Sequence, residues 1–217
     1  MSLQYRVVSV TSFQQNCSIV WCDETMDAIV VDPGGDVPKL EATIKELGVK
    51  VVNVVLTHGH LDHVGGAEEL ANAHSVDIIG PHKADNFWLQ GLEGQSQMFG
   101  FPLTEAFEPK QWLDEGDIVT FGNEVLNVYF TPGHSPGHVI LFNESSKTAF
   151  VGDVLFNGGI GRTDFPQGDF NTLIQSIKQK LWPLGNDVHF IPGHGPESTF
   201  GHERASNPFV ADEMPLY

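Results

Sequence analysis

The run from Thr57 to His63, with the sequence THGHLDH, packs three histidines and one aspartate into seven residues. Folded chains seldom place so many metal-ligating groups together unless they bind a metal. From the composition, the pattern His-x-His-x-Asp-His should arise by chance in on the order of one in a thousand such chains. The run therefore indicates a metal site, and a polar histidine-rich loop or a chance match is the alternative.

The flanks of this run restrict the fold. Residues 49–56 are almost continuously apolar or β-branched and predict a buried strand. Val64, Ala67, Leu70 and Ala71 then recur at helical spacing. The run thus lies between a strand end and a helix start, where α/β sheets place their sites.

Three later segments each show one polar residue just after an apolar stretch, among glycines and prolines. His134 follows residues 125–130, Asp153 follows residues 148–152, and His194 follows residues 188–191. Each segment predicts a strand that ends in a turn and exposes one ligand. A single Pro-Gly-His would be weak evidence for a metal ligand, but the ordered set of four elements is strong evidence.

This ordered set resembles the ligand pattern of the metallo-β-lactamase superfamily over nearly the whole chain. The resemblance implies an α+β fold, a four-layer αββα sandwich, in a single domain spanning residues 1–217. It implies one metal held by His58, His60 and His134, and a second held by Asp62, His63 and His194. Asp153 would bridge the two metals, and Asp62 and Asp153 would be the catalytic carboxylates.

The chemistry of these ligands explains the pattern. Imidazoles and carboxylates suit divalent transition ions, and we expect two of them, with zinc placed ahead of iron and manganese. Two ions about 3.5–4 Å apart can share a water and lower its pKa toward ~7, which makes a bridging hydroxide available as a nucleophile. This predicts hydrolysis of an activated acyl or phosphoryl bond.

Composition restricts the kinds of molecule that this protein can bind. The net charge of −17, with 11 Lys and Arg in 217 residues, argues against nucleic acid. The sequence contains no run of 18 apolar residues and does not begin like a secretory signal, so we expect no membrane span. Cys17 and Cys22 form no CxxC pair and are expected to be reduced in a cytoplasmic protein, one on a strand and one in the following turn. The oligomeric state stays open.

Two further helices are expected in the scaffold. Asp36 is a candidate N-cap for a helix that Gly48 ends, and Asp169 is a candidate N-cap for a helix that ends at Trp182-Pro183.

Residues 81–112 mix aromatic residues with glycines. An insertion of this kind between core strands can form a lid that offers apolar contacts to a substrate, with Phe87 and Trp88 as candidates. The alternative, given equal weight, is that the segment packs as extra core.

The segment from Gly161 to Phe165, GRTDF, narrows the resemblance to the glyoxalase II and persulfide dioxygenase branch. Arg162 either clamps a substrate carboxylate or pairs with Asp164, and the pairing is favoured. Thr57 and His138 are expected to support the ligands by hydrogen bonds. Residues 201–208 also resemble short bacterial glyoxalase II homologues. Only 23 residues follow His194, so the C-terminal domain through which full-length glyoxalase II binds glutathione is expected to be missing.

The predicted function is hydrolysis of a small anionic thioester, S-lactoylglutathione or a related compound. A thiolate leaves without much help from an acid, whereas an amide needs a proton donor that the sequence does not mark, so lactamase activity ranks low. The main alternative is a persulfide dioxygenase with one iron held by His58, His134 and Asp153. A metal-stabilised binding protein without turnover is the third hypothesis.

Overall fold

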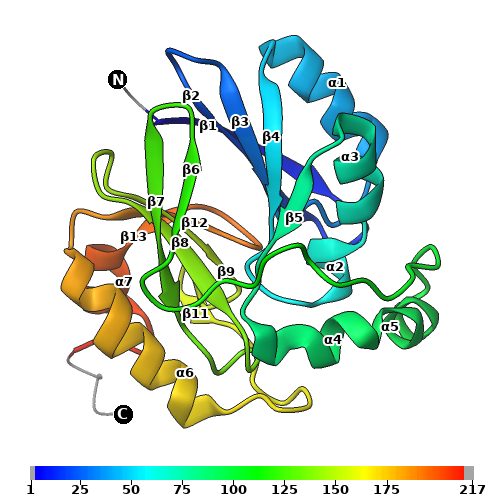
Figure 1. Ribbon diagram of the computed structural model, residues 1–217. Coiled ribbons are helices and arrows are strands. Elements are labelled where there is room, and N and C mark those ends of the chain that lie inside the picture. Colours follow the sequence, from blue (N-terminus) through cyan, green and yellow to red (C-terminus); the bar gives the residue numbers. More distant parts are fainter. Residues whose placement is uncertain (1–2, 213–217) are drawn as a thin grey trace.

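The computed structural model describes residues 3–212. Two β-sheets face each other, and helices cover the outer face of each sheet (Figure 1). This is the four-layer αββα sandwich that was expected, with mixed α and β content.

The first sheet has the strand order β1-β2-β3-β4-β5. β1 to β3 pair antiparallel, whereas β3, β4 and β5 run parallel. Helices α1 and α3 pack on its outer face through buried apolar residues such as Leu40, Ile44 and Leu70. The bounds of these elements are β1 Leu3–Val10, β2 Gln15–Cys22, β3 Asp27–Val31, α1 Val37–Leu47, β4 Lys50–Val55, α2 Leu61–Val64, α3 Ala67–His74 and β5 Asp77–Ile79.

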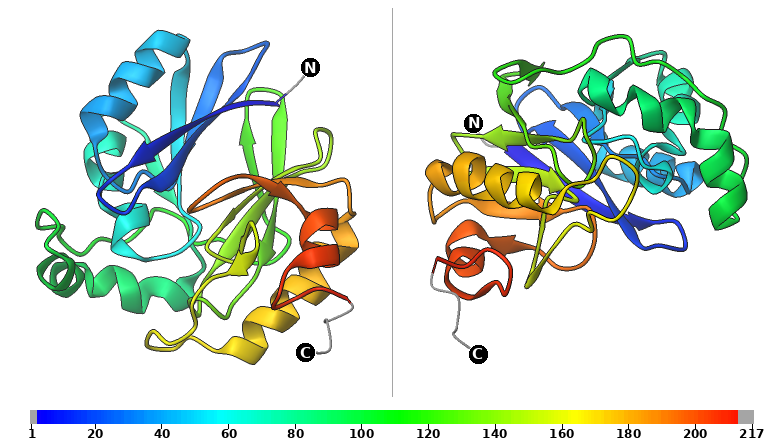
Figure 2. Two further views of the ribbon diagram at one scale, coloured as in Figure 1. Left: turned by 180° about the vertical axis from the view of Figure 1, so that it is seen from behind. Right: turned by 90° about the horizontal axis from the view of Figure 1, so that it is seen from below.

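The second sheet has the order β13-β12-β9-β8-β7-β6. Its outer face is covered by α6 and α7, which meet it through residues such as Leu173 and Phe200 (Figure 2). A short hairpin, β10 and β11, stands apart from both sheets. The bounds are β6 Ile118–Phe121, β7 Glu124–Phe130, β8 Val139–Asn143, β9 Thr148–Gly152, β10 Leu155–Phe156, β11 Gly159–Ile160, α6 Phe170–Ser176, β12 His189–Pro192, β13 Ser198–Thr199 and α7 Phe200–Ser206.

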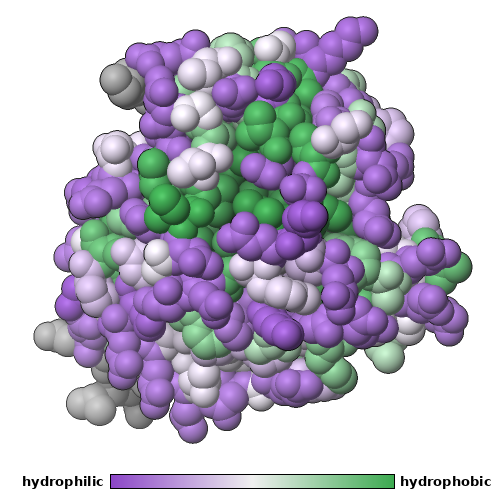
Figure 3. All heavy atoms as spheres, in the orientation of Figure 1, coloured by the Kyte–Doolittle hydropathy of each residue, from purple (hydrophilic) through white to green (hydrophobic). Residues whose placement is uncertain are grey.

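A common core joins the two sheets. Val20, Ile29 and Val55 of the first sheet pack with Leu126 and Phe150 of the second. Successive residues of a strand face opposite sides of its sheet, so each strand points some side chains toward the other sheet. These five side chains point that way and are buried. Figure 3 shows hydrophobic residues reaching the surface between the β6–β7 hairpin and the first sheet.

Helix boundaries differ from the sequence expectation in two places. Asp36 is not a side-chain cap, because it adopts the left-handed conformation and its carboxylate accepts a hydrogen bond from the N–H of Thr11. The helix expected after His63 is divided into α2 and α3 at Gly65 and Gly66. The N–H of Gly66 donates to the carbonyl of Pro33, 2.8 Å away, and this tertiary contact interrupts the helical periodicity.

Other boundary predictions are confirmed. Gly48 ends α1 in the left-handed conformation. Asp169 caps α6 by accepting a hydrogen bond from the N–H of Thr172 at 2.7 Å. The chain then continues as a π-helical turn over Ile177–Leu181 and a 3₁₀ turn over Trp182–Leu184.

Both cysteines are free, and both lie on β2, so the prediction that Cys22 follows the strand was wrong. Among residues 3–212, no helix is long and apolar enough to cross a membrane.

Residues 81–112 form a 3₁₀ turn at Lys83–Asp85 and two short helices, α4 Asn86–Gln90 and α5 Leu92–Phe99. Leu89, Leu92 and Phe107 are buried in the core that joins the first sheet to its outer helices. Trp88 and Phe99 instead line a pocket beside the histidine loops. The insertion therefore contributes to both the core and the pocket wall.

Candidate metal centre

The predicted ligands follow four strands at one edge of the sandwich; most lie on loops, whereas Asp62 and His63 lie in the short helix α2. The loop with His58 follows β4, His134 follows β7, Asp153 follows β9 and His194 follows β12. Strands β3 and β4 run parallel, as do β9 and β12, so each pair brings its carboxyl ends to the same edge. Segments more than 130 residues apart in the chain meet there.

The first cluster contains His58, His60 and His134, and one ligand atom from each lies within 4.8 Å of the others. Nδ1 of His60 and Nε2 of His134 are 2.9 Å apart. Nε2 of His58 is buried without a hydrogen-bond partner.

The second cluster contains Asp62, His63 and His194. Nε2 of His194 lies 3.1 Å from Oδ2 of Asp62, and Nε2 of His63 lies 3.8 Å from the same oxygen. Nε2 of His63 is also buried without a hydrogen-bond partner.

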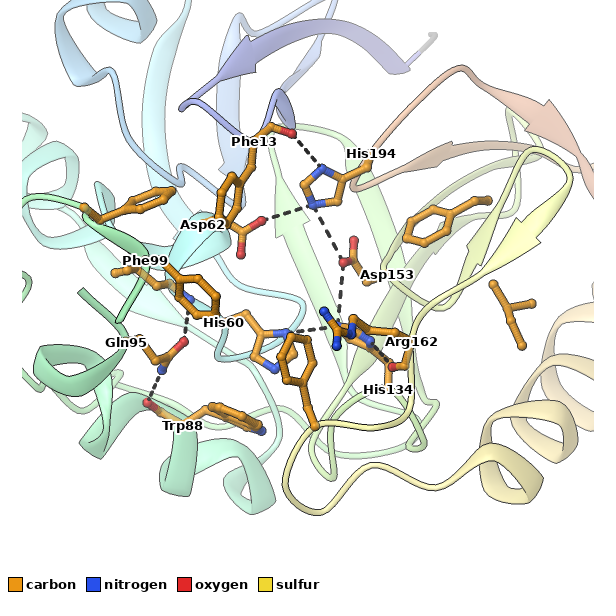
Figure 4. Close-up of a pocket in the computed structure, with 15 residues that line it drawn as sticks. Phe13, His60, Asp62, Trp88, Gln95, Phe99, His134, Asp153, Arg162 and His194 are labelled. Carbon is orange, nitrogen blue, oxygen red and sulfur yellow. Dashed lines mark hydrogen bonds and ion pairs between the residues drawn. The ribbon is translucent and has the colours of Figure 1, made fainter. Parts of the chain in front are cut away.

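Asp153 lies between the two clusters (Figure 4). Its Oδ1 is 3.4 Å from Nε2 of His63. Its Oδ2 is 3.6 Å from Nε2 of His134 and 3.7 Å from Nε2 of His194. One carboxylate therefore reaches both clusters, which is the geometry that a bridging ligand needs.

Hydrogen bonds on the far side of the imidazoles select their tautomers. Nδ1 of His63 donates to Asp32 at 2.9 Å, and Nδ1 of His134 donates to the carbonyl of Arg162 at 2.7 Å. Nδ1 of His194 donates to the carbonyl of Phe13 at 3.2 Å. Each proton held on Nδ1 leaves a lone pair on Nε2, the atom that faces the cluster.

Asp32 is a functional residue that the sequence reasoning missed. It follows β3 directly and is buried. Its Oδ1 accepts from the N–H of Thr57 at 2.7 Å, and its Oδ2 accepts from the hydroxyl of Thr57 at 2.6 Å and from His63. Ligand atoms of Asp32, His58 and His63 also lie within 4.8 Å of one another, but both oxygens of Asp32 already accept from these donors, so its role here is to orient ligands. An aspartate at the end of a buried strand, before Pro33-Gly34-Gly35, was the available signal.

Thr57 and His138 support His58 from two sides. Oγ1 of Thr57 lies 3.0 Å from Nδ1 of His58. The ring of His138 stacks on that of His58, with centroids 4.6 Å apart. We expected His138 to donate a hydrogen bond, but its Nε2 instead accepts one from the backbone N–H of Asp153 at 3.1 Å.

A second missed residue, Asp85, belongs to the insertion at residues 81–112. Its carboxylate is buried and accepts from the N–H of Gly59 at 2.8 Å, the hydroxyl of Ser135 at 2.7 Å and the N–H of Gly137. Burial raises its pKa to about 6, against the opposing effect of these donors. Asp85 thereby ties the His58–His60 loop to the His134 loop. No local sequence pattern marks such an acceptor.

The protonation preferences of the first cluster suit metal binding, whereas those of the second cluster reflect its carboxylates. Burial lowers the pKa of His58, His60 and His134, which favours neutral imidazoles. Burial also disfavours charge on His63, but the carboxylates of Asp153 and Asp62 outweigh it and raise the pKa of His63.

The carboxylates respond to the same charges. Burial opposes ionisation of Asp62 and Asp153, but His63 and neighbouring imidazoles outweigh it and lower the pKa of both. Both carboxylates are therefore ionised. A divalent cation would supply the positive charge that protonated imidazoles otherwise provide.

The residues present fit two divalent ions. Nε2 of His58, Nε2 of His63 and Oδ1 of Asp153 are buried polar atoms without partners, and such atoms are costly unless something binds them. Gly193 lies against the cluster so closely that a Cβ there would overlap Oδ1 of Asp153 and Cε1 of His63. The donor set, imidazole nitrogens and carboxylate oxygens, matches the preference of transition ions.

A pocket of about 430 Å³ opens onto these ligands. Trp88 lines it, whereas Phe87 does not and is 49% exposed. Arg162 also lines it, but its guanidinium makes two hydrogen bonds to Asp164, at 2.7 and 2.6 Å. The structure thus shows the pairing that was favoured for Arg162.

Comparisons with known proteins identify the family of this chain. Residues 10–194 match the family described as metallo-beta-lactamase superfamily. The chain is 46% identical over 209 residues to hydroxyacylglutathione hydrolase GloC of Haemophilus influenzae, covering 96% of this chain and 98% of the relative. It is also 33% identical to the B3 metallo-beta-lactamase BLEG-1, with a TM-score of 0.88 and coverage of 95% and 99%.

A second solved structure, TTHA1623 in a di-iron-bound form, is 33% identical with a TM-score of 0.86, covering 94% of this chain and 100% of that chain. Family match, relative and fold lead to one assignment. The chain belongs to the metallo-β-lactamase superfamily of metallohydrolases.

Proposed function

We propose that this protein is a dinuclear metallohydrolase of small acyl thioesters such as S-lactoylglutathione. The observation that carries the proposal is the complete second cluster. Asp62, His63 and His194 stand beside the first cluster, and Asp153 lies within 3.4–3.7 Å of nitrogens from both. A mononuclear enzyme would leave this second set without an ion.

The roles of the residues follow from their positions. Two divalent ions bound by the clusters would lower the pKa of a shared water toward ~7 and polarise a carbonyl. His58, His60 and His134 would hold one ion, and Asp62, His63 and His194 the other, with Asp153 shared between them. Asp32 fixes the His63 ring, and the carbonyl of Arg162 fixes the His134 ring.

The pocket favours a good leaving group. Among the described residues that line it, there is no lysine, tyrosine or cysteine to protonate a departing amine. A thiolate, with a reference pKa near 8.5, needs little such help. This supports a thioester over a β-lactam, even though one similar structure is a β-lactamase.

The relatives support the same proposal. The 46% identical protein is named a hydroxyacylglutathione hydrolase, and a 33% identical structure carries two irons. We propose zinc as the metal, with iron or manganese as substitutes that the same donor set accommodates. A cytoplasmic location belongs to the proposal, since both cysteines are free and buried.

One preparation can test this. Metal content, S-lactoylglutathione hydrolysis, hydrolysis of a β-lactam and persulfide-dependent O₂ uptake should be measured together. We expect about two ions per chain, thioester hydrolysis and no O₂ uptake. One iron per chain with persulfide-dependent O₂ uptake would establish a dioxygenase instead, and bound metal without any turnover would indicate a binding protein.

The variant Asp62→Ala sharpens the test, because Asp62 belongs only to the second cluster. We expect it to bind about one ion and to lose thioester hydrolysis by at least about 100-fold. Full activity in this variant would contradict the two-metal proposal.

A further inference from the structure

The part of the pocket wall that does not ligate metal is mainly aromatic. Phe13, from the turn between β1 and β2, lies on one side with Phe99 and Phe101 of the insertion. Trp88 and Phe165 lie around His60, with ring centroids 4.5 and 5.1 Å from its imidazole. Figure 4 shows Phe13 near Asp62 and His194, and Trp88 on the other side of His60.

Phe13, Phe99 and Phe101 form a cluster, here called the aromatic cluster. The ring centroid of Phe13 is 5.8 Å from that of Phe99 and 5.0 Å from that of Phe101, both edge to face. Phe13 nevertheless remains 44% exposed and Phe99 40% exposed. Exposed aromatic rings grouped at the mouth of a pocket gain most from an apolar ligand that covers them.

The aromatic cluster lies next to the reacting centre. Phe13, Phe99 and Phe101 line the same pocket as the ligands Asp62, Asp153 and His194. An apolar group of a substrate bound at these ligands would therefore be within reach of these rings.

The same pocket offers little to a carboxylate. Arg162 is the one arginine or lysine among the described lining residues, and its Nε and Nη2 donate to Asp164, which balances its charge, while its Cζ lies 4.1 Å from the centroid of Phe165. Gln95 is occupied as well, because its Oε1 accepts from the N–H of Leu61 and its Nε2 donates to the carbonyl of Trp88. The two carboxylates of a glutathione thioester thus meet, along this wall, only the remaining N–H groups of one guanidinium whose charge Asp164 already balances.

We propose that the site selects thioesters by a bulky apolar acyl group that packs against the aromatic cluster, and not by the carboxylates of the thiol. The inference rests on the proposed thioester hydrolysis. In that reaction water adds to the acyl carbon, the C–S bond breaks, and the carboxylic acid and thiol are released. The preferred substrates would be aryl-substituted or branched hydroxyacyl thioesters.

The acyl preference is tested with two substrates that share their thiol. S-mandeloylglutathione carries a phenyl group where S-lactoylglutathione carries a methyl group. We expect kcat/KM to be about tenfold or more higher for the mandeloyl substrate, since even one methylene in an apolar pocket changes selectivity by about tenfold or more. Equal or faster hydrolysis of the lactoyl substrate would overturn the inference.

The thiol is tested by removing its carboxylates. In S-mandeloyl-N-acetylcysteamine, the thiol lacks both carboxylates of glutathione. We expect its kcat/KM to stay within about threefold of that for S-mandeloylglutathione, whereas a loss of about 100-fold or more would show that the enzyme recognises glutathione after all.

Variants assign the preference to the aromatic cluster. Phe13→Ala and Phe99→Ala should each lower the ratio of mandeloyl to lactoyl kcat/KM by at least about threefold. Phe170→Ala is the matched control, because Phe170 is 48% exposed on α6 and does not line the pocket. An unchanged ratio in both cluster variants, or an equal change in the control, would contradict the assignment.

A binding measurement separates this inference from the proposed function. S-benzylglutathione and S-methylglutathione have no thioester carbonyl, so their affinities can be compared by calorimetry on the metal-loaded protein without turnover. We expect the benzyl compound to bind at least about tenfold more tightly. If no thioester is hydrolysed, the proposed function fails, and this comparison still decides whether the aromatic cluster binds apolar groups.

Discussion

Single atoms around the candidate metal centre have little freedom. Oδ1 of Asp153 and Nε2 of His63 are buried without hydrogen-bond partners, yet the backbone of Gly193 packs directly against both side chains. Neither residue can move away on that side. Gly193, which has no side chain and binds no metal, therefore limits the positions of these ligand atoms.

Gly193→Ala tests this constraint. The added methyl group would overlap Oδ1 of Asp153 and Cε1 of His63, so these ligands must shift. We expect metal affinity to fall by about 10–100-fold, comparable with the loss of a residue that orients a ligand. Calorimetric titration of the metal-free protein measures this affinity.

The control for this change is Gly94→Ala in α5, where a Cβ meets nothing within 4 Å. We expect it to stabilise the helix by about 0.5–1 kcal/mol and to bind metal like the wild type. Wild-type metal affinity in Gly193→Ala would show that the ligands have more freedom than the packing indicates.

Asp32 acts on the second cluster through His63. Asp32→Asn keeps the size of the side chain but replaces one acceptor oxygen with an NH₂ donor, which cannot satisfy both Thr57 and His63. We expect metal affinity at the second position to fall about 10–100-fold, while the first position changes less. Titration followed by metal analysis resolves the two steps. Asp77→Asn, at an exposed position on β5, is the control, and equal loss at both positions would contradict the role given to Asp32.

At the scale of elements, the loops that carry the ligands were predictable from sequence because each follows an apolar strand and is punctuated by glycine or proline. The loops of Thr57–His63, His134, Asp153 and His194 all lie where this pattern placed them. Local periodicity is a reliable guide when a strand is buried on both faces.

Asp32 and Asp85 were not predictable in the same way. Each serves groups 25 to 52 residues away in the chain, so their roles exist only after the fold brings those segments together. The break between α2 and α3 has the same origin, since the carbonyl of Pro33 binds the N–H of Gly66. Tertiary contacts decided these features: the local pattern marked the position of Asp32 at a strand end but not its partners, and it did not mark Asp85 or the break between the helices.

The turn that carries Asp85 joins two ligand loops, and Asp85→Ala tests that role. The change leaves the N–H groups of Gly59 and Gly137 and the hydroxyl of Ser135 without their acceptor. We expect a loss of about 3 kcal/mol in the free energy of unfolding, because an unsatisfied buried polar group costs about 1–3 kcal/mol. Urea denaturation measures this loss, and metal titration should show weaker binding by the first cluster.

Lys83→Ala, at an exposed position in the same 3₁₀ turn, is the control for Asp85→Ala and should behave like the wild type. If Asp85→Ala unfolded at the wild-type urea concentration and bound metal normally, Asp85 would not stabilise the metal centre.

At the scale of the whole molecule, the candidate centre connects the two sheets. His58, His60, Asp62 and His63 follow a strand of the first sheet, whereas His134, Asp153 and His194 follow strands of the second. Each cluster takes ligands from both sheets. Bound ions would therefore link the two layers at the edge where their shared core ends.

Metal removal should consequently lower the stability of the entire fold. An ion at 100 times its dissociation constant contributes about 2.7 kcal/mol per site if it binds only the folded state. For a chain of this size, that corresponds to about 5–11 °C in Tm for each site. Calorimetric melting before and after treatment with a chelator measures the shift, and readdition of the metal should restore it. Because Asp62→Ala removes a ligand from one cluster only, its melting temperature should respond to metal about half as much. An equal response in the variant and the wild type would show that the second cluster does not bind an ion that links the sheets.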